Sequence, residues 1–208
     1  MVVALQANYL EVELDVAPDG CPRRLLCTRR TRLSHRGEAV YVGDRVRVEA
    51  IDPGQGRAVV AEVEPRHSFL TRPPVANVSL VAVVLAVEQP SFDPDQASRF
   101  LLTAERTGLE VILLLTKTDL LSAAALERLV TRLQGWGYDP LALSSAAGTG
   151  IDALRQRLAG AQLSVLCGPS GVGKSSLLNQ LRPDLQLRTA AVSDLSLIHI
   201  SEPTRQIR

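Results

Sequence analysis

Residues 168–175 match the pattern G-x-x-x-x-G-K-S/T, which typically binds the phosphates of a nucleotide. The apolar run 163–167 precedes this loop, and a segment with Leu177, Leu178 and Leu181 at helical spacing follows it. The loop therefore has the strand and helix on either side that a phosphate-binding loop requires. A glycine-rich turn that matches by chance is the alternative, and these flanking elements disfavour it.

The chemistry that this loop predicts is the binding of phosphate and Mg²⁺. Glycines let backbone N–H groups curl around phosphate oxygens, and the positive end of the following helix dipole attracts the same anion. We expect Lys174 to reach the β- and γ-phosphate oxygens and Ser175 to offer its hydroxyl to Mg²⁺. The predicted phosphate site comprises Gly168, Ser170, Gly171, Val172, Gly173, Lys174, Ser175 and Ser176.

A second set of polar residues follows two other predicted strands and fits guanine recognition. It comprises Thr116, Lys117 and Asp119, in the pattern N/T-K-x-D of guanine-nucleotide enzymes, and Ser145 and Ala146 of a Ser-Ser-Ala segment. Asp119 would accept hydrogen bonds from guanine N1–H and the 2-amino group, a pair that adenine lacks. Lys117 would lie along the base, and Ala146 would donate its backbone N–H to guanine O6. Exposed loops without a ligand are the alternative.

Residues 74–194 are predicted to form the α/β domain that positions both sets. The segments 78–87 and 111–115 are nearly continuous apolar runs, typical of strands in a parallel sheet that is covered on both faces. Helices are predicted at residues 95–107, after Ser122 and at residues 151–158. Alternating strands and helices indicate an α/β fold, with the polar loops at the carboxyl edge of its sheet.

Residues 1–73 are predicted to form an all-β barrel of the OB type. Its five short strands are expected at residues 1–5, 9–14, 24–28, 46–50 and 58–63, with turns rich in glycine, proline and aspartate between them. Loops of such barrels commonly hold nucleic acid. Residues 66–76, which include Pro73 and Pro74, are predicted to be an extended linker.

The barrel segment is strongly basic between Cys21 and Glu38. This stretch contains Arg23, Arg24, Arg29, Arg30, Arg32 and Arg36 and no acidic residue. Such a loop could neutralise RNA phosphates, but a solvated loop is the alternative, because acidic residues elsewhere in the segment cancel most of the charge. Aromatic residues are scarce, so sequence-specific reading of bases is not supported.

The composition is that of a chain able to bury a core, with 208 residues, 46% of them hydrophobic, and a net charge of +1. We expect no membrane segment and no secretory signal, and therefore a cytoplasmic location. The three cysteines, Cys21, Cys27 and Cys167, fit a reducing compartment. A zinc site at Cys21 and Cys27 is unsupported, because no second pair or histidine cluster accompanies them.

Residues 116–119, called the base motif below, precede the phosphate loop at 168–175 in the sequence. This is the order of a circularly permuted GTPase. With the arginine-rich barrel in front, and with Val-Gly-Asp-Arg-Val at 42–46 and Ser-Phe-Leu-Thr-Arg-Pro at 68–73, the chain resembles the ribosome small-subunit-dependent GTPase A family. The resemblance covers residues 1 to about 194. It implies a monomeric GTPase that uses GTP/GDP and Mg²⁺, binds 16S rRNA in the 30S ribosomal subunit and helps that subunit mature. The alternatives are a P-loop NTPase unrelated to ribosomes, and a binder of RNA and nucleotide without turnover.

The resemblance raises one expectation about Thr116. Many GTPases have asparagine at this position, where the amide braces the phosphate loop. We expect threonine to remove that brace and to weaken the selectivity for guanine. Because of Asp119, the site should still prefer guanine to adenine.

The resemblance also implies parts that follow the phosphate-loop helix in the intact family member: two switch segments, two further strands and a small zinc domain. Residues 195–208 instead match the translation of a sequencing-library adapter, and we expect them to be a non-native tail. A genuine short C-terminus is the alternative. On the first interpretation the strand 163–167 has an open edge, and this chain is poorly soluble and turns over negligible GTP.

Overall fold

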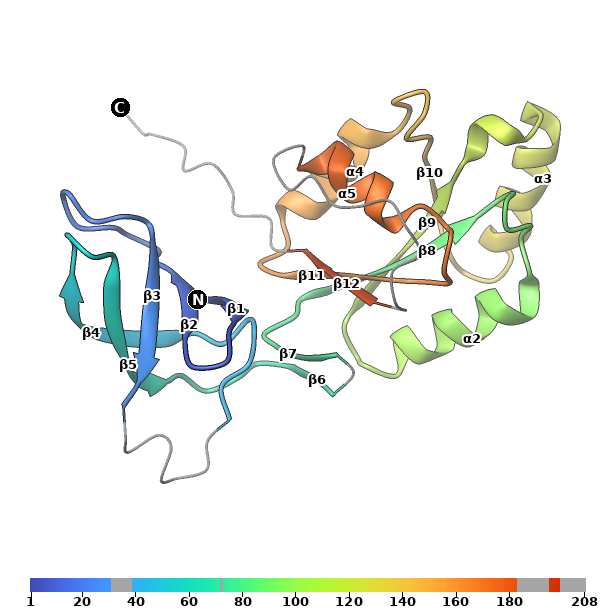
Figure 1. Ribbon diagram of the computed structural model, residues 1–208. Coiled ribbons are helices and arrows are strands. Elements are labelled where there is room, and N and C mark those ends of the chain that lie inside the picture. The colour runs from blue at the N-terminus through green and yellow to red at the C-terminus, as the bar shows by residue number, and fades with distance from the viewer. Residues whose placement is uncertain (31–38, 72, 183–194, 199–208) are drawn as a thin grey trace. The chain divides into compact units, whose positions relative to one another are not determined.

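The computed structural model describes residues 1–30, 39–71, 73–182 and 195–198, and for the last segment only the backbone. The chain divides into two compact units, Met1–Val78 and Ser79–Arg208. Figure 1 labels the elements of each unit. Among the described residues, no helix is both long enough and apolar enough to cross a membrane.

The first unit is built on a five-stranded sheet with the order β1-β2-β3-β5-β4. Its strands are β1 (Val2–Leu5), β2 (Leu10–Glu13), β3 (Arg24–Arg29), β4 (Val46–Asp52) and β5 (Arg57–Val63). All neighbours are antiparallel except β3 and β5, which are parallel. Val2 N–H donates to Asp44 O, and Gly43 N–H donates to Val2 O, both at 2.8 Å, so β1 meets the chain just before β4. The predicted barrel of the OB type is confirmed.

Alternate residues of the barrel strands fill its interior, as the period of two in a strand requires. The buried set is Val2, Leu10, Val12, Leu25, Cys27, Val40, Ala58 and Val60. Burial raises the pKa of Cys27 to about 11, so its thiol is neutral near pH 7. Cys27 is therefore a core residue of the barrel.

The segment predicted to be a linker forms a hairpin instead. Strands β6 (Phe69–Thr71) and β7 (Pro74–Ala76) pair antiparallel. Asn77, which follows them, donates from its side chain to Gly43 O at 3.0 Å and accepts from His67 N–H at 2.9 Å. The linker prediction is wrong because the backbone groups of this segment find partners within the first unit. The unit consequently ends at Val78, later than the boundary predicted after residue 73.

A buried ion pair fixes the approach to β4. The Asp44 side chain is fully buried, and its two oxygens accept from Arg66 Nε at 2.7 Å and Arg66 Nη2 at 2.9 Å. Tyr41 N–H donates to the same carboxylate at 2.8 Å. The Arg66 guanidinium also lies 4.9 Å from the ring centre of Tyr41 and 5.1 Å from that of Phe69. Asp44 of the segment 42–46 is thus linked through the Arg66 guanidinium to Phe69, which lies in the second segment that carries the family resemblance.

The second unit is the predicted α/β domain, with a sheet in the order β10-β9-β8-β11-β12 (Figure 1). The strands are β8 (Leu80–Ala86), β9 (Glu110–Thr116), β10 (Leu141–Ala142), β11 (Ser164–Cys167) and β12 (Leu195–Ile198). The helices are α2 (Pro94–Glu105), α3 (Ala123–Gln134), α4 (Ile151–Ala159) and α5 (Lys174–Leu181), with a 3-10 turn η1 (Thr118–Leu120). The strands β8, β9, β10 and β11 pair in parallel.

Strand β8 is the centre of this unit, because all of its residues are buried. Leu80, Ala82, Val84 and Ala86 pack in one cluster with buried residues of α4 and α5. The intervening residues, Val81, Val83 and Leu85, pack in a second cluster with residues of α2 and α3. Helices cover both faces of the sheet, which is why the sequence of β8 shows a continuous apolar run rather than alternation.

The far edge of β11 is paired rather than open. Strand β12 lies antiparallel to β11, from the pair Cys167 and Leu195 to the pair Ser164 and Ile198. The expectation of an open edge along the strand 163–167 is wrong for this structure. Unpaired N–H and C=O groups along an apolar strand attract any extended segment that can reach them, and residues 195–198 supply one.

The buried pair provides a test of the barrel's stability. We expect Asp44→Asn to lower the free energy of unfolding by about 1–3 kcal/mol, because an amide group would face the N–H donors of Arg66 and Tyr41. The matched control is Glu49→Gln, since Glu49 pairs with Arg30 at an exposed position. Calorimetric unfolding of both variants measures the difference. Equal melting temperatures for the two variants would contradict the assigned role of Asp44.

Candidate functional site

The sheet brings the predicted loops to one edge. In the register of the parallel strands, Cys167 of β11 lies beside Val83 of β8, and Leu113 of β9 lies beside Val83 on the other side. The phosphate loop follows β11. The segment from Thr116 to Asp119 begins at the last residue of β9, and Ser144 lies after β10. All three segments therefore leave the sheet at its carboxyl edge, as the sequence predicts.

Three glycines allow the shape of the phosphate loop. A Cβ on Gly168 would lie 2.0 Å from Val84 O, so any other residue there would collide with the backbone of β8. Gly171 and Gly173 have φ of +79° and +92°, which side chains disfavour. Gly173 also precedes α5 and makes no side-chain cap hydrogen bond, and the amino end of a helix is a favourable place for an anion.

Lys174 is held inside the phosphate loop. Its ammonium donates hydrogen bonds to Gly168 O and Pro169 O, each at 2.7 Å, and the residue is buried. Neighbouring Cys167 has its pKa raised to about 11 by burial, against the opposing effect of the Lys174 charge. The positive charge of Lys174 therefore has no thiolate beside it near pH 7, and this arrangement suits a phosphate ligand.

The remaining predicted members of the phosphate site lie around the same loop. Ser170 is exposed, and Ser175 and Ser176 are half-buried in the first turn of α5. That the Ser175 hydroxyl binds Mg²⁺ stays a prediction. Among the described residues, no three of His, Cys, Asp and Glu gather into a metal site. The uncapped helix end, the buried lysine and the glycine backbone together fit a nucleotide phosphate with its Mg²⁺.

Thr116 braces the phosphate loop, which corrects the expectation drawn from its residue type. The residue is buried, and its hydroxyl donates to Val172 O at 2.5 Å while lying 3.2 Å from Leu85 O. A hydroxyl suffices here because β9 ends close enough to the loop for the shorter side chain to reach. Threonine therefore keeps a brace to the phosphate loop, and its effect on the selectivity for guanine stays a prediction.

Lys117 adds a second link between the base motif and the phosphate loop. Its backbone is left-handed, with φ of +59°, and its ammonium donates to Gly171 O at 2.8 Å and also to Gln89 O. The Lys117 side chain therefore runs across the opening between the two loops. That its aliphatic part lies along the base stays a prediction.

Asp119 is fixed by a residue that sequence reasoning did not include in the site. Ser144, which is buried, donates from its hydroxyl to Asp119 Oδ1 at 2.5 Å. The same Ser144 hydroxyl accepts from Ala147 N–H at 3.0 Å, and Ser144 N–H donates to Thr149 O at 3.0 Å. Ser144 was visible as the first residue of Ser-Ser-Ala. Only the structure shows that it orients the carboxylate predicted to read guanine.

Ser145 and Ala146 lie on the turn that Ser144 begins. Ser145 is half-buried and Ala146 is exposed. Ser145 O accepts a hydrogen bond from Gln180 Nε2 at 3.0 Å, and Gln180 lies on α5. Sequence reasoning missed Gln180, because a polar residue on an exposed helix face gives no signal of its own.

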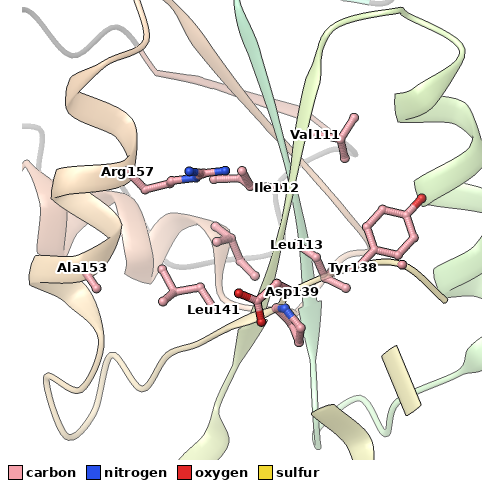
Figure 2. A pocket seen from close by; sticks show the side chains of 11 residues that line it. Val111, Ile112, Leu113, Tyr138, Asp139, Leu141, Ala153 and Arg157 are labelled. Carbon is pink, nitrogen blue, oxygen red and sulfur yellow. The ribbon is translucent and has the colours of Figure 1, made fainter. Parts of the chain in front are cut away.

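A pocket of about 350 Å³ lies elsewhere in this unit (Figure 2). It opens beside the first half of β9, where β10 pairs only with Leu114 and Leu115. Figure 2 shows Tyr138, Asp139 and Arg157 among the side chains that line it. None of the predicted nucleotide-site residues lines this pocket, so it is separate from the site described above.

Comparison with known proteins gives one consistent family. Residues 63–197 match the family model RsgA GTPase. Over 193 residues, the chain is 98% identical to a small ribosomal subunit biogenesis GTPase RsgA of Synechococcus sp. strain CC9605 and 74% identical to one of strain CC9311. In both comparisons the match covers 93% of this chain but 64% of the relative. The chain thus spans about two thirds of the length of these relatives.

Solved structures agree with the sequence comparison. The crystal structure of YjeQ from Thermotoga maritima matches with a TM-score of 0.78 at 34% identity, over 90% of this chain and 66% of that one. The structure of YloQ, described as a circularly permuted GTPase, matches with a TM-score of 0.70 at 28% identity, over 88% of this chain and 63% of that one. The permuted order predicted from the motifs is therefore found in proteins of the same fold.

The Thr116 brace is tested by removing its hydroxyl alone. We expect Thr116→Val to lower the free energy of unfolding of the second unit by about 1–3 kcal/mol, because Val172 O would be left without its donor. Fluorescence of Trp136, the single tryptophan of the chain, reports on this unit. Thr116→Ser keeps the hydroxyl and serves as the control. If Val and Ser variants unfold at the same denaturant concentration, the hydroxyl does not brace the loop.

Proposed function

The chain belongs to the RsgA GTPase family, and from this premise we propose that it binds GTP and GDP and that the whole protein hydrolyses GTP during maturation of the 30S subunit. One observation carries the proposal. The base motif and the phosphate loop, far apart in sequence, meet at one sheet edge, where Thr116 and Lys117 donate to Val172 O and Gly171 O. Two loops that brace each other can hold the two ends of one nucleotide.

The proposed roles follow from the donors and acceptors that each residue offers. The first N–H groups of α5 and the Lys174 ammonium bind phosphate, and the Asp119 carboxylate accepts from the guanine edge. The Ala146 N–H donates to guanine O6. Mg²⁺, when bound beside Ser175, would neutralise charge on the β- and γ-phosphate oxygens. The protein's own contribution is to orient the nucleotide and to keep these charges in fixed positions.

The alternatives differ in which base is bound and whether turnover occurs. An ATP-specific P-loop enzyme would gain nothing from the carboxylate of Asp119, which faces the donors of guanine and not those of adenine. A nucleotide binder without turnover would keep the same site, so the geometry of the site does not distinguish it. Single-turnover hydrolysis with and without 30S subunits separates that alternative. That residues 1–208 alone hydrolyse negligible GTP stays a prediction.

For the partner, we propose contact between the barrel and 16S rRNA. Arg32 and Arg36 of the basic loop lie outside the described residues. Among the described arginines, Arg23 and Arg24 pair with Glu13 at 3.3 and 3.2 Å, and Arg30 pairs with Glu49 at 3.0 Å. Arg29 is exposed. The Arg30 pair is exposed and therefore weak, so a phosphate can compete for Arg30. Glu13, the partner of Arg23 and Arg24, is buried, although the two arginine side chains are about half exposed.

The location and the oligomeric state are part of the same proposal. We expect a cytoplasmic monomer, since the small ribosomal subunit matures where it is assembled and one chain carries both the base site and the phosphate site. Zinc is proposed only for the intact protein, as the resemblance implies, and no described residue takes part in it.

Base selectivity is tested at Asp119. We expect Asp119→Asn to raise the dissociation constant for GDP by about 10- to 100-fold, because a hydrogen-bonded charge is lost. The same change should improve binding of xanthosine diphosphate, since the amide can donate to the C2 carbonyl. Fluorescent-nucleotide titration measures both. Asp139→Asn is the control, because Asp139 is a carboxylate of the same unit that lines the separate pocket. Unchanged GDP affinity in Asp119→Asn would remove the assignment of the base site.

The RNA contact is tested by salt dependence. We expect the variant Arg29→Ala, Arg30→Ala, Arg32→Ala to bind 30S subunits more weakly and with a salt slope lower by about one per lost phosphate contact. Nucleotide affinity should not change. Arg47→Ala is the control, because Arg47 pairs with Glu49 and Glu62 on the barrel surface. If the triple variant keeps the affinity and slope of the wild type, the solvated-loop interpretation holds.

A further inference from the structure

A single hydrogen bond joins the helix of the phosphate loop to the loop proposed to read guanine. Gln180 Nε2, near the end of α5, donates to Ser145 O at 3.0 Å. The two residues are 35 positions apart in the sequence. The bond therefore connects the two halves of the nucleotide site at a point different from the Thr116 brace.

The acceptor of this bond belongs to the peptide group that is proposed to contact the base. Ser145 O and Ala146 N–H are in the same peptide group, which is planar, and in a trans peptide they point in opposite directions. The cis peptide in the described chain is Gln89–Pro90, not this one. A donor that fixes the direction of Ser145 O must therefore also fix the direction of Ala146 N–H.

From this geometry we infer that Gln180 is a positioning residue for guanine, which aims the Ala146 N–H at the O6 acceptor by holding Ser145 O. The inference rests on the proposed function, since it deepens the assignment of the base site. Gln180 is not a catalytic residue, because its side chain touches the loop and not the nucleotide. Its effect is confined to the one contact that distinguishes a 6-oxo purine from a purine without that oxygen.

The loop needs such support because its own side chains cannot provide it. Ala146 and Ala147 are exposed, and each side chain is a single methyl group. The structure anchors the turn at its start, through Ser144, and near its end, where Gly150 approaches Ala142 O so closely that a Cβ would lie 2.4 Å from it. The peptide between Ser145 and Ala146 lies between these anchors, where Gln180 supplies a third.

The supporting residue is itself held in place. Arg155 of α4 donates from Nη2 to Gln180 O at 2.8 Å and from Nη1 to Asp152 at 2.9 Å. An arginine at the carboxyl end of a helix also interacts favourably with the helix dipole. The next residue, Leu181, is buried in the core. The backbone of Gln180 is thus fixed to α4, and this holds the side-chain amide of Gln180 in position.

One helix consequently serves both ends of the nucleotide. Residue Lys174 begins α5 at the phosphates, and Gln180 lies near its other end beside the base loop. The distance between phosphate site and O6 donor is then set by a rigid helix rather than by loop flexibility. This gives a physical reason for a nucleotide with a 6-oxo purine to fit best.

The test is the nucleotide affinity of Gln180→Met in the full 208-residue chain. Methionine has nearly the same size and is uncharged, but it has no N–H donor. We expect the dissociation constant for GDP to rise by about three- to tenfold, because one hydrogen bond no longer orients the peptide. The diphosphate of 2-aminopurine riboside has no O6, so its dissociation constant should not change. Gln134→Met, on the exposed face of α3, is the matched control.

The outcomes separate this inference from the proposed function. Equal loss of affinity for GDP and for the 2-aminopurine nucleotide would overturn the inference, since the effect would then not pass through O6. Unchanged GDP affinity in Gln180→Met, alongside weakened GDP binding in Asp119→Asn, would also overturn it while leaving the base site intact. Unchanged GDP affinity in Asp119→Asn would instead remove the proposed function and the inference together.

Discussion

The hydrogen bond from the Thr116 hydroxyl to Val172 O is the interaction on which the site depends. It joins residues 56 positions apart and brings the end of β9 against the phosphate loop. Both atoms are buried, so no water replaces either partner, and the bond is worth more than an exposed one. Lys117 reinforces it from the exposed side through Gly171 O. The base motif and the phosphate loop therefore form one structural unit before any ligand binds.

The parallel sheet explains why the two motifs can occur in either order along the chain and still form one site. Strands β8 and β11 are neighbours in register although Ser164 and Leu80 lie far apart in sequence. In a parallel sheet every strand ends at the same edge, so the loops meet whichever strand comes first. What the chain order must preserve is the strand order around β8, which is buried on both faces and cannot be moved to an edge.

The sequence predicts the elements and the motif residues well, because their signals are local. The apolar runs of β8 and β9, the capping residues Asp93 and Ser122 and the glycines of the loop all act within a few residues. The contributions of Thr116, Asn77 and Gln180 were missed or misjudged because each depends on a partner more than thirty residues away. A residue type shows which bonds are possible, and only the fold shows which acceptor is within reach.

Two of the hydrogen bonds that connect the base loop with the phosphate loop or its helix, those of Thr116 and Gln180, differ in burial. The Thr116 bond is buried and fixes the position of the loops, while the Gln180 bond is exposed and fixes the direction of one peptide group. Loss of the first should therefore change stability together with binding, because a buried acceptor is left unpaired. Loss of the second leaves Ser145 O accessible to water, so stability is preserved and only the aim of the Ala146 N–H is lost. We therefore expect Thr116 on β9 to affect stability and binding together, and Gln180 on α5 to affect binding alone.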